Sequence, residues 1–340
     1  MTDRQDPITR AADGQRDLQG ITTWEPRSLP DRLLARYVWL VIRLAIVGLA
    51  TLVFGGVLVL LAVQMVFAPE ALLAVFLFPL SVVPALIIVG YVWYTDVSRE
   101  PILLLLATFL LGVVLSAFPF VTNTATLLLV GGFFEVPVIG FFLQAAFFFL
   151  IVAPMEELVT LGAVFAYVYW HDSFDTVIDG AVYGAAAGLG FATIENFAYI
   201  VQVLAGAEGM LELVVGAGVI TGIRGIVGPG HVIWTALAGY YLGLAKFNPE
   251  YRLALVTKGL LIAIVLHATY NTMATGIGRA GAAVGLELLV FPVLVAFIVC
   301  YHGIVLGYLL LRLSRYRRAY MEVGLEDRSR GQPDRPADGP

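Results

Sequence analysis

Residues 147–164 read Phe-Phe-Phe-Leu-Ile-Val-Ala-Pro-Met-Glu-Glu-Leu-Val-Thr-Leu-Gly-Ala-Val. The stretch belongs to an apolar run, 139–169, that is long enough to cross a bilayer as a helix. Two adjacent carboxylates, Glu156 and Glu157, lie inside this run, and the run contains no basic residue that would neutralise them. An ionisable side chain in a bilayer costs on the order of 3 kcal/mol on insertion scales. The run therefore predicts a transmembrane helix, and the pair predicts a functional site within the membrane.

The composition of the whole chain agrees with this interpretation. Hydrophobic residues make up 60% of its 340 residues and charged residues 13%, and the mean hydropathy is +0.89. These values exclude a soluble globular protein and predict a polytopic membrane protein whose surroundings are the lipid bilayer. The net charge of -5 argues against nucleic-acid binding. With Cys300 as its only cysteine, the chain has neither an internal disulfide framework nor a multi-cysteine zinc site.

Apolar runs of about 20 residues predict the fold class, which is an all-α bundle of about eight transmembrane helices. A shorter apolar piece at 125–138 fits a re-entrant segment, and the stretch that contains Arg224 is interpreted as a loop. The predicted spans are 40–67, 71–94, 101–121, 139–169, 177–204, 229–246, 254–275 and 287–311.

The chain is expected to form one membrane-embedded domain, 34–318, between disordered polar tails at 1–33 and 319–340. Lys and Arg residues gather near the N-terminal tail, near the C-terminal tail and in the loops that share their side. The opposite loops hold little more than Arg224 and Arg279. The positive-inside rule therefore places both termini in the cytoplasm, as expected for an integral protein of the cell membrane.

Polar side chains occur at comparable depths in four of the predicted helices. Counting about 1.5 Å per residue places them about 18 to 28 Å from the cytoplasmic ends, a spread that helix tilt can absorb. We expect one polar cluster, because isolated charges in a membrane would each need separate compensation. Asn271 lies four residues after His267 and shares its helix face. The four residues are Glu156, Glu195, His231 and His267.

A stripe of small residues predicts close helix packing beside this cluster. Gly180, Gly184 and Gly188 recur every four residues and let a second backbone approach closely. Phe191 and Glu195 continue the same stripe. Glu195 is therefore predicted to point at a neighbouring helix.

Four patterns in order carry a family resemblance across a motif core at 153–271: Ala-Pro-Met-Glu-Glu, Asp-Gly-x-x-Tyr-Gly-x-x-x-Gly-x-Gly-Phe-x-x-x-Glu-Asn, Gly-His-x-x-Trp-Thr-Ala-x-x-Gly-Tyr-Tyr-x-Gly and Leu-His-x-x-x-Asn. Together they resemble the PrsW family of intramembrane proteases, which is related to the CAAX prenyl endopeptidases and the bacteriocin-processing proteins. The resemblance implies an intramembrane endopeptidase. Where the family commonly has lysine, this chain has Thr160, so the counter-charge of the glutamates has to come from the histidines, a metal or a shared proton. The implied catalytic residues are Glu156, Glu157, Glu195, His231, His267 and Asn271.

Two forms of peptide hydrolysis fit these residues. In the first, Glu156 or Glu157 is the general base on a water, His231 orients the water or delivers a proton, and His267 and Asn271 stabilise the oxyanion. In the second, a bound Zn²⁺ activates the water. We place the metal-free form slightly ahead, because the ligands would come from separate helices without a His-Glu-x-x-His run. The candidate ligands for zinc are Glu156, Glu195, His231 and His267.

Two other functions remain open from the sequence. Buried Glu and His side chains also form proton relays, so a proton- or cation-coupled transporter is one alternative. A catalytically inactive membrane scaffold of the same fold is the other, since the lysine is replaced. For a protease, the resemblance implies a membrane-protein substrate, such as a single-pass anti-sigma factor.

Overall fold

The computed structural model describes residues 29, 32, 69–136 and 138–322. Every regular element within those residues is a helix, which confirms the predicted all-α class. Seven helical segments in the described part are long and apolar enough to cross a membrane. The predicted span 40–67 lies outside the described residues.

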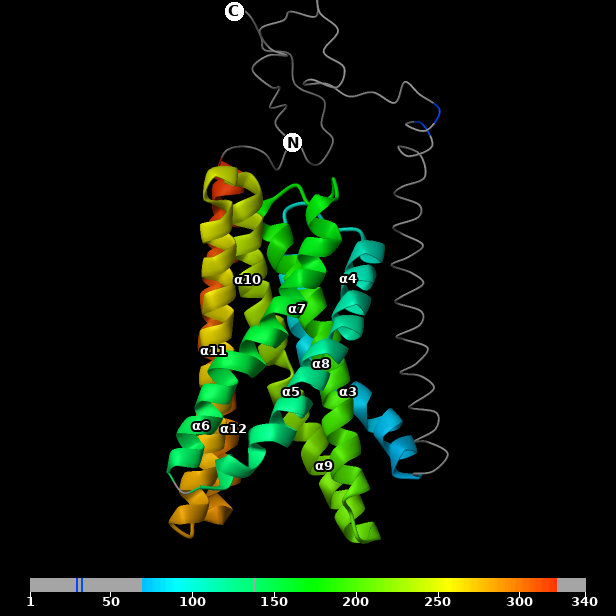
Figure 1. Cartoon of the computed structure of the whole chain (residues 1–340). Coiled ribbons are helices and arrows are strands. Elements are labelled where there is room, and N and C mark those ends of the chain that lie inside the picture. The colour runs from blue at the N-terminus through cyan, green and yellow to red at the C-terminus, as the bar shows by residue number, and fades with distance from the viewer. Residues whose placement is uncertain (1–28, 30–31, 33–68, 137, 323–340) are drawn as a thin grey trace, which may run out of the picture. The chain divides into compact units, whose positions relative to one another are not determined.

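Several of these segments consist of two helices joined by a break (Figure 1). Ser116 separates α4 from α5, Gly228 separates α9 from α10, and a π-helical turn, η2 (Phe148–Val152), joins α6 to α7. The α-helices are α3 (Pro69–Tyr94), α4 (Ile102–Leu115), α5 (Ala117–Val130), α6 (Ile139–Phe147), α7 (Ala153–Ala166), α8 (Val177–Ala205), α9 (Met210–Val227), α10 (Pro229–Phe247), α11 (Arg252–Ala283) and α12 (Glu287–Glu322).

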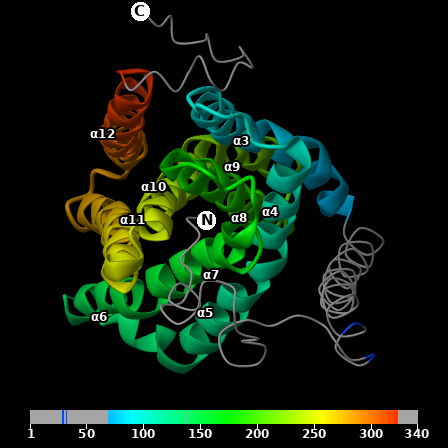
Figure 2. The same cartoon turned by 90° about the horizontal axis from the view of Figure 1, so that it is seen from above.

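Helix α8 forms the centre of the bundle. Most of its length is buried, as is most of α10, whereas most residues of α3, α4, α11 and α12 are at least partly exposed. Figure 2 shows α8 surrounded by α3, α4, α7 and α10. Exposed leucines, valines and phenylalanines on the outer helices suit contact with lipid.

Glycines bring α8 and α10 into backbone contact. A Cβ on Gly180 would collide with the carbonyl oxygen of Gly239, and a Cβ on Gly239 would collide with that of Gly180. Further along the same stripe, a Cβ on Gly188 would collide with the carbonyl oxygen of His231. The predicted small-residue stripe is therefore confirmed as the seam between the two helices.

Replacing Gly180 by alanine is expected to lower the thermal unfolding midpoint of the purified protein by about 5 °C or more, since forcing apart tightly packed groups costs on the order of 1 to 3 kcal/mol. Gly218→Ala in α9 is the matched control, because no atom of the described residues lies within 4 Å of a Cβ built at that position. It should leave the midpoint unchanged or raise it slightly. Equal midpoints for the two variants would contradict close packing at the seam.

The structure corrects two predictions about the spans. The segment from Met210 to Phe247 is one candidate span, so the stretch containing Arg224 is helix α9 and not a loop. Likewise, Ile102–Glu135 is one candidate span, and residues 125–135 of the piece predicted as re-entrant form its C-terminal end. Both errors have the same cause, because a break near the middle of each helix pair interrupts the apolar pattern.

Two boundaries also differ from the prediction. Helix α11 continues to Ala283 and contains Arg279, which the sequence placed in a loop. Helix α12 runs through Glu322, whereas the C-terminal tail was predicted to begin at residue 319.

Candidate active site

The first turn of α7 places the two adjacent glutamates in the interior. The π-helical turn η2 runs directly into α7, and Pro154, which has no N–H to donate to the preceding turn, lies just after it. Such π-helical turns are frequent at functional sites. Glu156 and Glu157 are 6% and 1% exposed, respectively. The local break in helical geometry therefore coincides with the pair of buried carboxylates.

The two glutamates face the two ring nitrogens of His267 on α11. His267 Nδ1 lies 3.0 Å from Glu157 Oε1, and His267 Nε2 lies 3.7 Å from Glu156 Oε2. The second oxygen of Glu157 accepts a 3.4 Å hydrogen bond from Thr235. Both carboxylate oxygens of Glu157 therefore have a hydrogen-bond partner, whereas Oε2 of Glu156 has none among the described residues.

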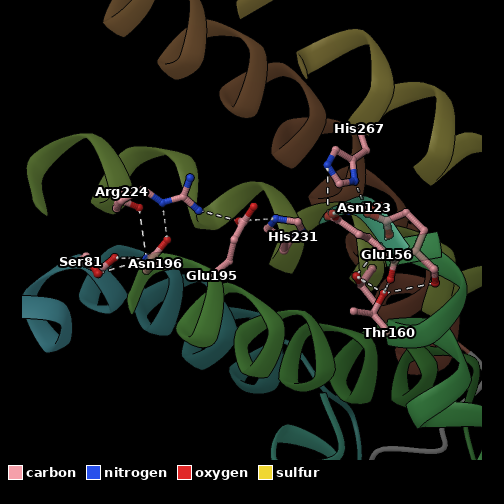
Figure 3. Close-up of polar contacts among 11 residues, drawn as sticks. Ser81, Asn123, Glu156, Thr160, Glu195, Asn196, Arg224, His231 and His267 are labelled. Atoms are coloured by element: carbon pink, nitrogen blue, oxygen red, sulfur yellow. Dashed lines mark hydrogen bonds and ion pairs between the residues drawn. The ribbon is translucent and has the colours of Figure 1, made fainter. Parts of the chain in front are cut away.

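A second imidazole is held in the same way. His231, in the first turn of α10, lies with Nε2 2.9 Å from Glu195 Oε2 on α8 (Figure 3). The prediction that Glu195 points at a neighbouring helix is confirmed. The rings of His231 and His267 are 5.0 Å apart and nearly perpendicular, so the two pairs form one site.

Arg224 supplies the positive charge that the sequence analysis did not find. It is 6% exposed and donates a 2.6 Å hydrogen bond to Glu195 Oε2. Its Nε donates to Asn196 Oδ1 at 2.8 Å, and the amide of Asn196 donates to the carbonyl oxygen of Ser81 on α3 at 3.1 Å. The network links three helices (Figure 3). The available signal was an arginine inside an apolar run, which is expensive in a membrane unless it is paired.

Asn123 on α5 is a second residue that the sequence analysis missed. Its amide donates a 2.8 Å hydrogen bond to Glu156 Oε1. Thr160, at the position where lysine was expected, donates to the main-chain oxygen of Glu156 at 2.9 Å. A neutral amide and a hydroxyl therefore contact Glu156 where a cation was expected.

Aromatic side chains enclose the two histidines. Trp234 stacks on His267, with ring centroids 4.4 Å apart, and Phe191 packs against His231 at 4.7 Å. Both histidines are at most 3% exposed. Packing of this kind fixes the ring orientation and strengthens electrostatic interactions by excluding water.

The donor set fits a zinc ion. Glu156, His231 and His267 each offer one ligand atom, and these atoms lie within 4.8 Å of one another. Two buried atoms of this group, Glu156 Oε2 and His231 Nδ1, have no hydrogen-bond partner in the described part of the chain. Both histidines also present their other nitrogen to a carboxylate, Glu157 or Glu195, as metal-binding histidines commonly do.

Two predicted site residues lie outside the converging group of three. Glu195 was a candidate ligand, but it supports His231 from the side and is not in the converging group. Asn271 lies one turn after His267 on α11 and is partly buried. Among the described residues its amide has no hydrogen-bond partner, so its catalytic role stays a prediction.

The part of the chain that contains this site is similar to known proteins. The sequence pattern of the family described as PrsW family intramembrane metalloprotease matches residues 100–301. The chain is 31% identical over 212 residues to Protease PrsW of Geobacillus kaustophilus, covering 62% of this chain and 84% of that protein. It is 30% identical over 204 residues to Protease PrsW of Bacillus subtilis, covering 58% and 83%, respectively. Protease PrsW of Clostridioides difficile is 29% identical over 201 residues, covering 57% and 77%. No solved structure matches significantly.

Proposed function

This chain belongs to the PrsW family of intramembrane metalloproteases, and from that membership we propose that Glu156, His231 and His267 hold a Zn²⁺ ion where peptide bonds of membrane proteins are hydrolysed. The observation that carries the proposal is the convergence of these three buried side chains, two of them with unpartnered polar atoms. Zinc supplies a Lewis acid that lowers the pKa of water toward 7 and polarises a carbonyl group.

The supporting carboxylates fix the histidine tautomers. Glu157 favours the proton on Nδ1 of His267, and Glu195 favours the proton on Nε2 of His231. These tautomers leave a lone pair on His267 Nε2 and on His231 Nδ1 for a metal. The same hydrogen bonds increase the basicity of each imidazole.

Glu195 is our candidate for proton transfer. Its side chain is 25% exposed, against 7% for Glu156 and 1% for Glu157. Its Oε2 atom binds Arg224 and His231, whereas Oε1 has no hydrogen-bond partner in the described part of the chain. Oε1 can therefore accept a proton from the attacking water and return it to the leaving amine. The amide of Asn271 is our candidate donor to the oxyanion.

Removal of the metal tests this proposal. Membranes from cells that produce the protein should contain cleavage fragments of resident membrane proteins that are missing from cells producing Glu156→Gln. Treatment with a zinc chelator should abolish their formation, and added Zn²⁺ should restore it, because in this proposal the bound metal activates the water.

Two outcomes would contradict parts of the proposal. Cleavage that resists chelation but is lost in Glu156→Gln would favour the metal-free form, with the unpartnered Glu156 Oε2 as the general base. No difference in fragments between wild type and Glu156→Gln would favour the scaffold or the transporter.

The nature of the substrate follows from where the site lies. All the site residues are on helices inside the bundle, so the substrate has to present its scissile bond within or beside the membrane. We propose a single-pass membrane protein as substrate. The α3–α4 connection, which contains Arg99, and the α10–α11 connection, which Lys246 and Arg252 flank, lie at one end of the bundle (Figure 1). This bias favours placing that end in the cytoplasm, and cytoplasmic termini stay a prediction.

A further inference from the structure

A second group of buried carboxylates lies at the end of the bundle where α8 begins. Asp96 and Glu100 belong to the connection between α3 and α4, and Asp179 lies in the first turn of α8. They are 7%, 3% and 0% exposed, and one oxygen of each lies within 4.8 Å of the others. Asp179 precedes Glu195 by 16 residues on the same helix, so about 24 Å separate this group from the active site.

Among the described residues, no basic side chain forms an ion pair with these carboxylates, although the charge of Lys246 acts on Asp179 and Glu100 from a longer distance. In the described part of the chain, no Lys, Arg or His nitrogen lies within 4.0 Å of any of them. Lys246 lies at the same end of the bundle, but its Nζ donates to the main-chain oxygens of Tyr169 and His171. Buried charge without compensation is strongly destabilising, so three anions here require a further partner.

Two members of the group already receive hydrogen bonds suited to an ionised carboxylate. Asp179 accepts from the main-chain N–H groups of Asp175 and Thr176, at 2.7 Å and 2.6 Å, and from the Thr176 hydroxyl. Glu100 accepts from the phenol of Tyr183. All of these donors are neutral, so they orient the carboxylates and do not neutralise them.

Asp96 provides the independent sign of a missing ligand. The hydrogen bond from the main-chain N–H of Ser98 to its Oδ1 atom is long, at 3.4 Å, and the main-chain N–H groups of Val97 and Glu100 contribute weaker contacts. The Oδ2 atom of Asp96 is buried and has no hydrogen-bond partner. Burial, with the Asp179 charge second, raises the pKa of Asp96 to about 7, and the same two causes raise the pKa of Glu100. Raised pKa values of this kind are expected for carboxylates that need a cation or a proton to balance their charge.

We propose that Asp96, Glu100 and Asp179 bind a divalent cation, Ca²⁺ or Mg²⁺, that ties the α3–α4 connection to the start of α8. Three carboxylates and no imidazole or thiolate form the donor set that these hard cations prefer. Calcium holds oxygens at about 2.3 to 2.6 Å, so two of its ligands lie up to about 5 Å apart, which agrees with the spacing of the group. The inference does not depend on the proposed catalytic mechanism.

Thermal unfolding of the purified, chelator-treated, full-length protein tests the proposal. Titration with CaCl₂ and, separately, with MgCl₂ should raise the unfolding midpoint saturably, by about 5 °C, with at least one of the two ions. Asp96→Asn should abolish this rise. The exposed neighbour Asp172 supplies the matched control, and Asp172→Asn should keep the rise. His267→Ala should keep it too, which separates this site from the active site.

Calorimetric titration of the wild-type protein provides a measurement that does not depend on a variant. One cation bound per chain, in wild type and in His267→Ala alike, is the expected result. Absence of any saturable binding or stabilisation by either ion would overturn the proposal. In that case stability should fall as the pH rises from about 4 toward 7, since the folded chain would hold the Asp96 proton more tightly than the unfolded chain does.

Discussion

Replacing His267 by alanine is expected to reduce peptide cleavage by about 1,000-fold or more and to lower the zinc content of the purified protein well below one ion per chain. His267 is one of the three proposed zinc ligands, and its ring lies between the two glutamates of α7, with Glu157 within hydrogen-bond distance. Loss of a metal ligand removes both the metal and the activation of water. The measurements are the rate of formation of substrate fragments and zinc content by atomic absorption.

His302 offers a matched control for that substitution. It is also a buried histidine beside Trp234, but its Nδ1 atom contacts the main-chain oxygen of Ile226, and it is not in the converging group. His302→Ala should lower stability by leaving a cavity, yet retain zinc. Wild-type cleavage by His267→Ala, or equal loss of zinc in both variants, would contradict the assigned site.

Substitution of Arg224 by glutamine is expected to lower the free energy of unfolding by about 3 kcal/mol, because removing one partner of a buried ion pair leaves the other uncompensated. Arg224 contacts Glu195 at 2.6 Å and is itself anchored by Asn196. Cleavage should also fall, since an unrestrained Glu195 no longer holds His231 in place. Unfolding in a denaturing detergent series and fragment formation are the two measurements.

A double-mutant cycle identifies the cause of this loss. Glu195→Gln combined with Arg224→Gln should recover part of the stability lost by Arg224→Gln alone, with a coupling energy of at least about 1 kcal/mol. Arg279→Gln is the control, because Arg279 donates to the Phe134 carbonyl and to Gln144 and pairs with no carboxylate of the described residues. If the two single losses simply add, the ion pair is not what stabilises this region.

Much of the fold could be predicted because long apolar runs leave few alternatives to transmembrane helices. The confirmed spans are those with an unbroken pattern, such as α8 and α11. The pairs α4–α5 and α9–α10 were misread because each contains a break, at Ser116 and Gly228. Hydropathy gives the length of an apolar run, but it does not show whether two consecutive short helices form a single transmembrane span.

The site was predictable to the extent that its residues lie in local patterns. Spacing of four residues identified the face shared by His267 and Asn271, and the stripe of small residues identified the direction of Glu195. Arg224 and Asn123 were missed because their partners lie 29 and 33 residues away in the chain. Hydrogen bonds over such separations depend on which helices become neighbours, and spacing within one helix carries no information about that.

The seam between α8 and α10 couples the thermal stability of the protein to the position of a site residue. Gly188 packs against the backbone of His231, so the same contact that holds two helices together also sets the position of a proposed zinc ligand. Substitutions along the seam should therefore reduce heat resistance and cleavage in proportion to each other. Substitution of His267 should instead remove cleavage from a protein that still folds, so a plot of one property against the other would separate variants that lose the scaffold from variants that lose only the chemistry.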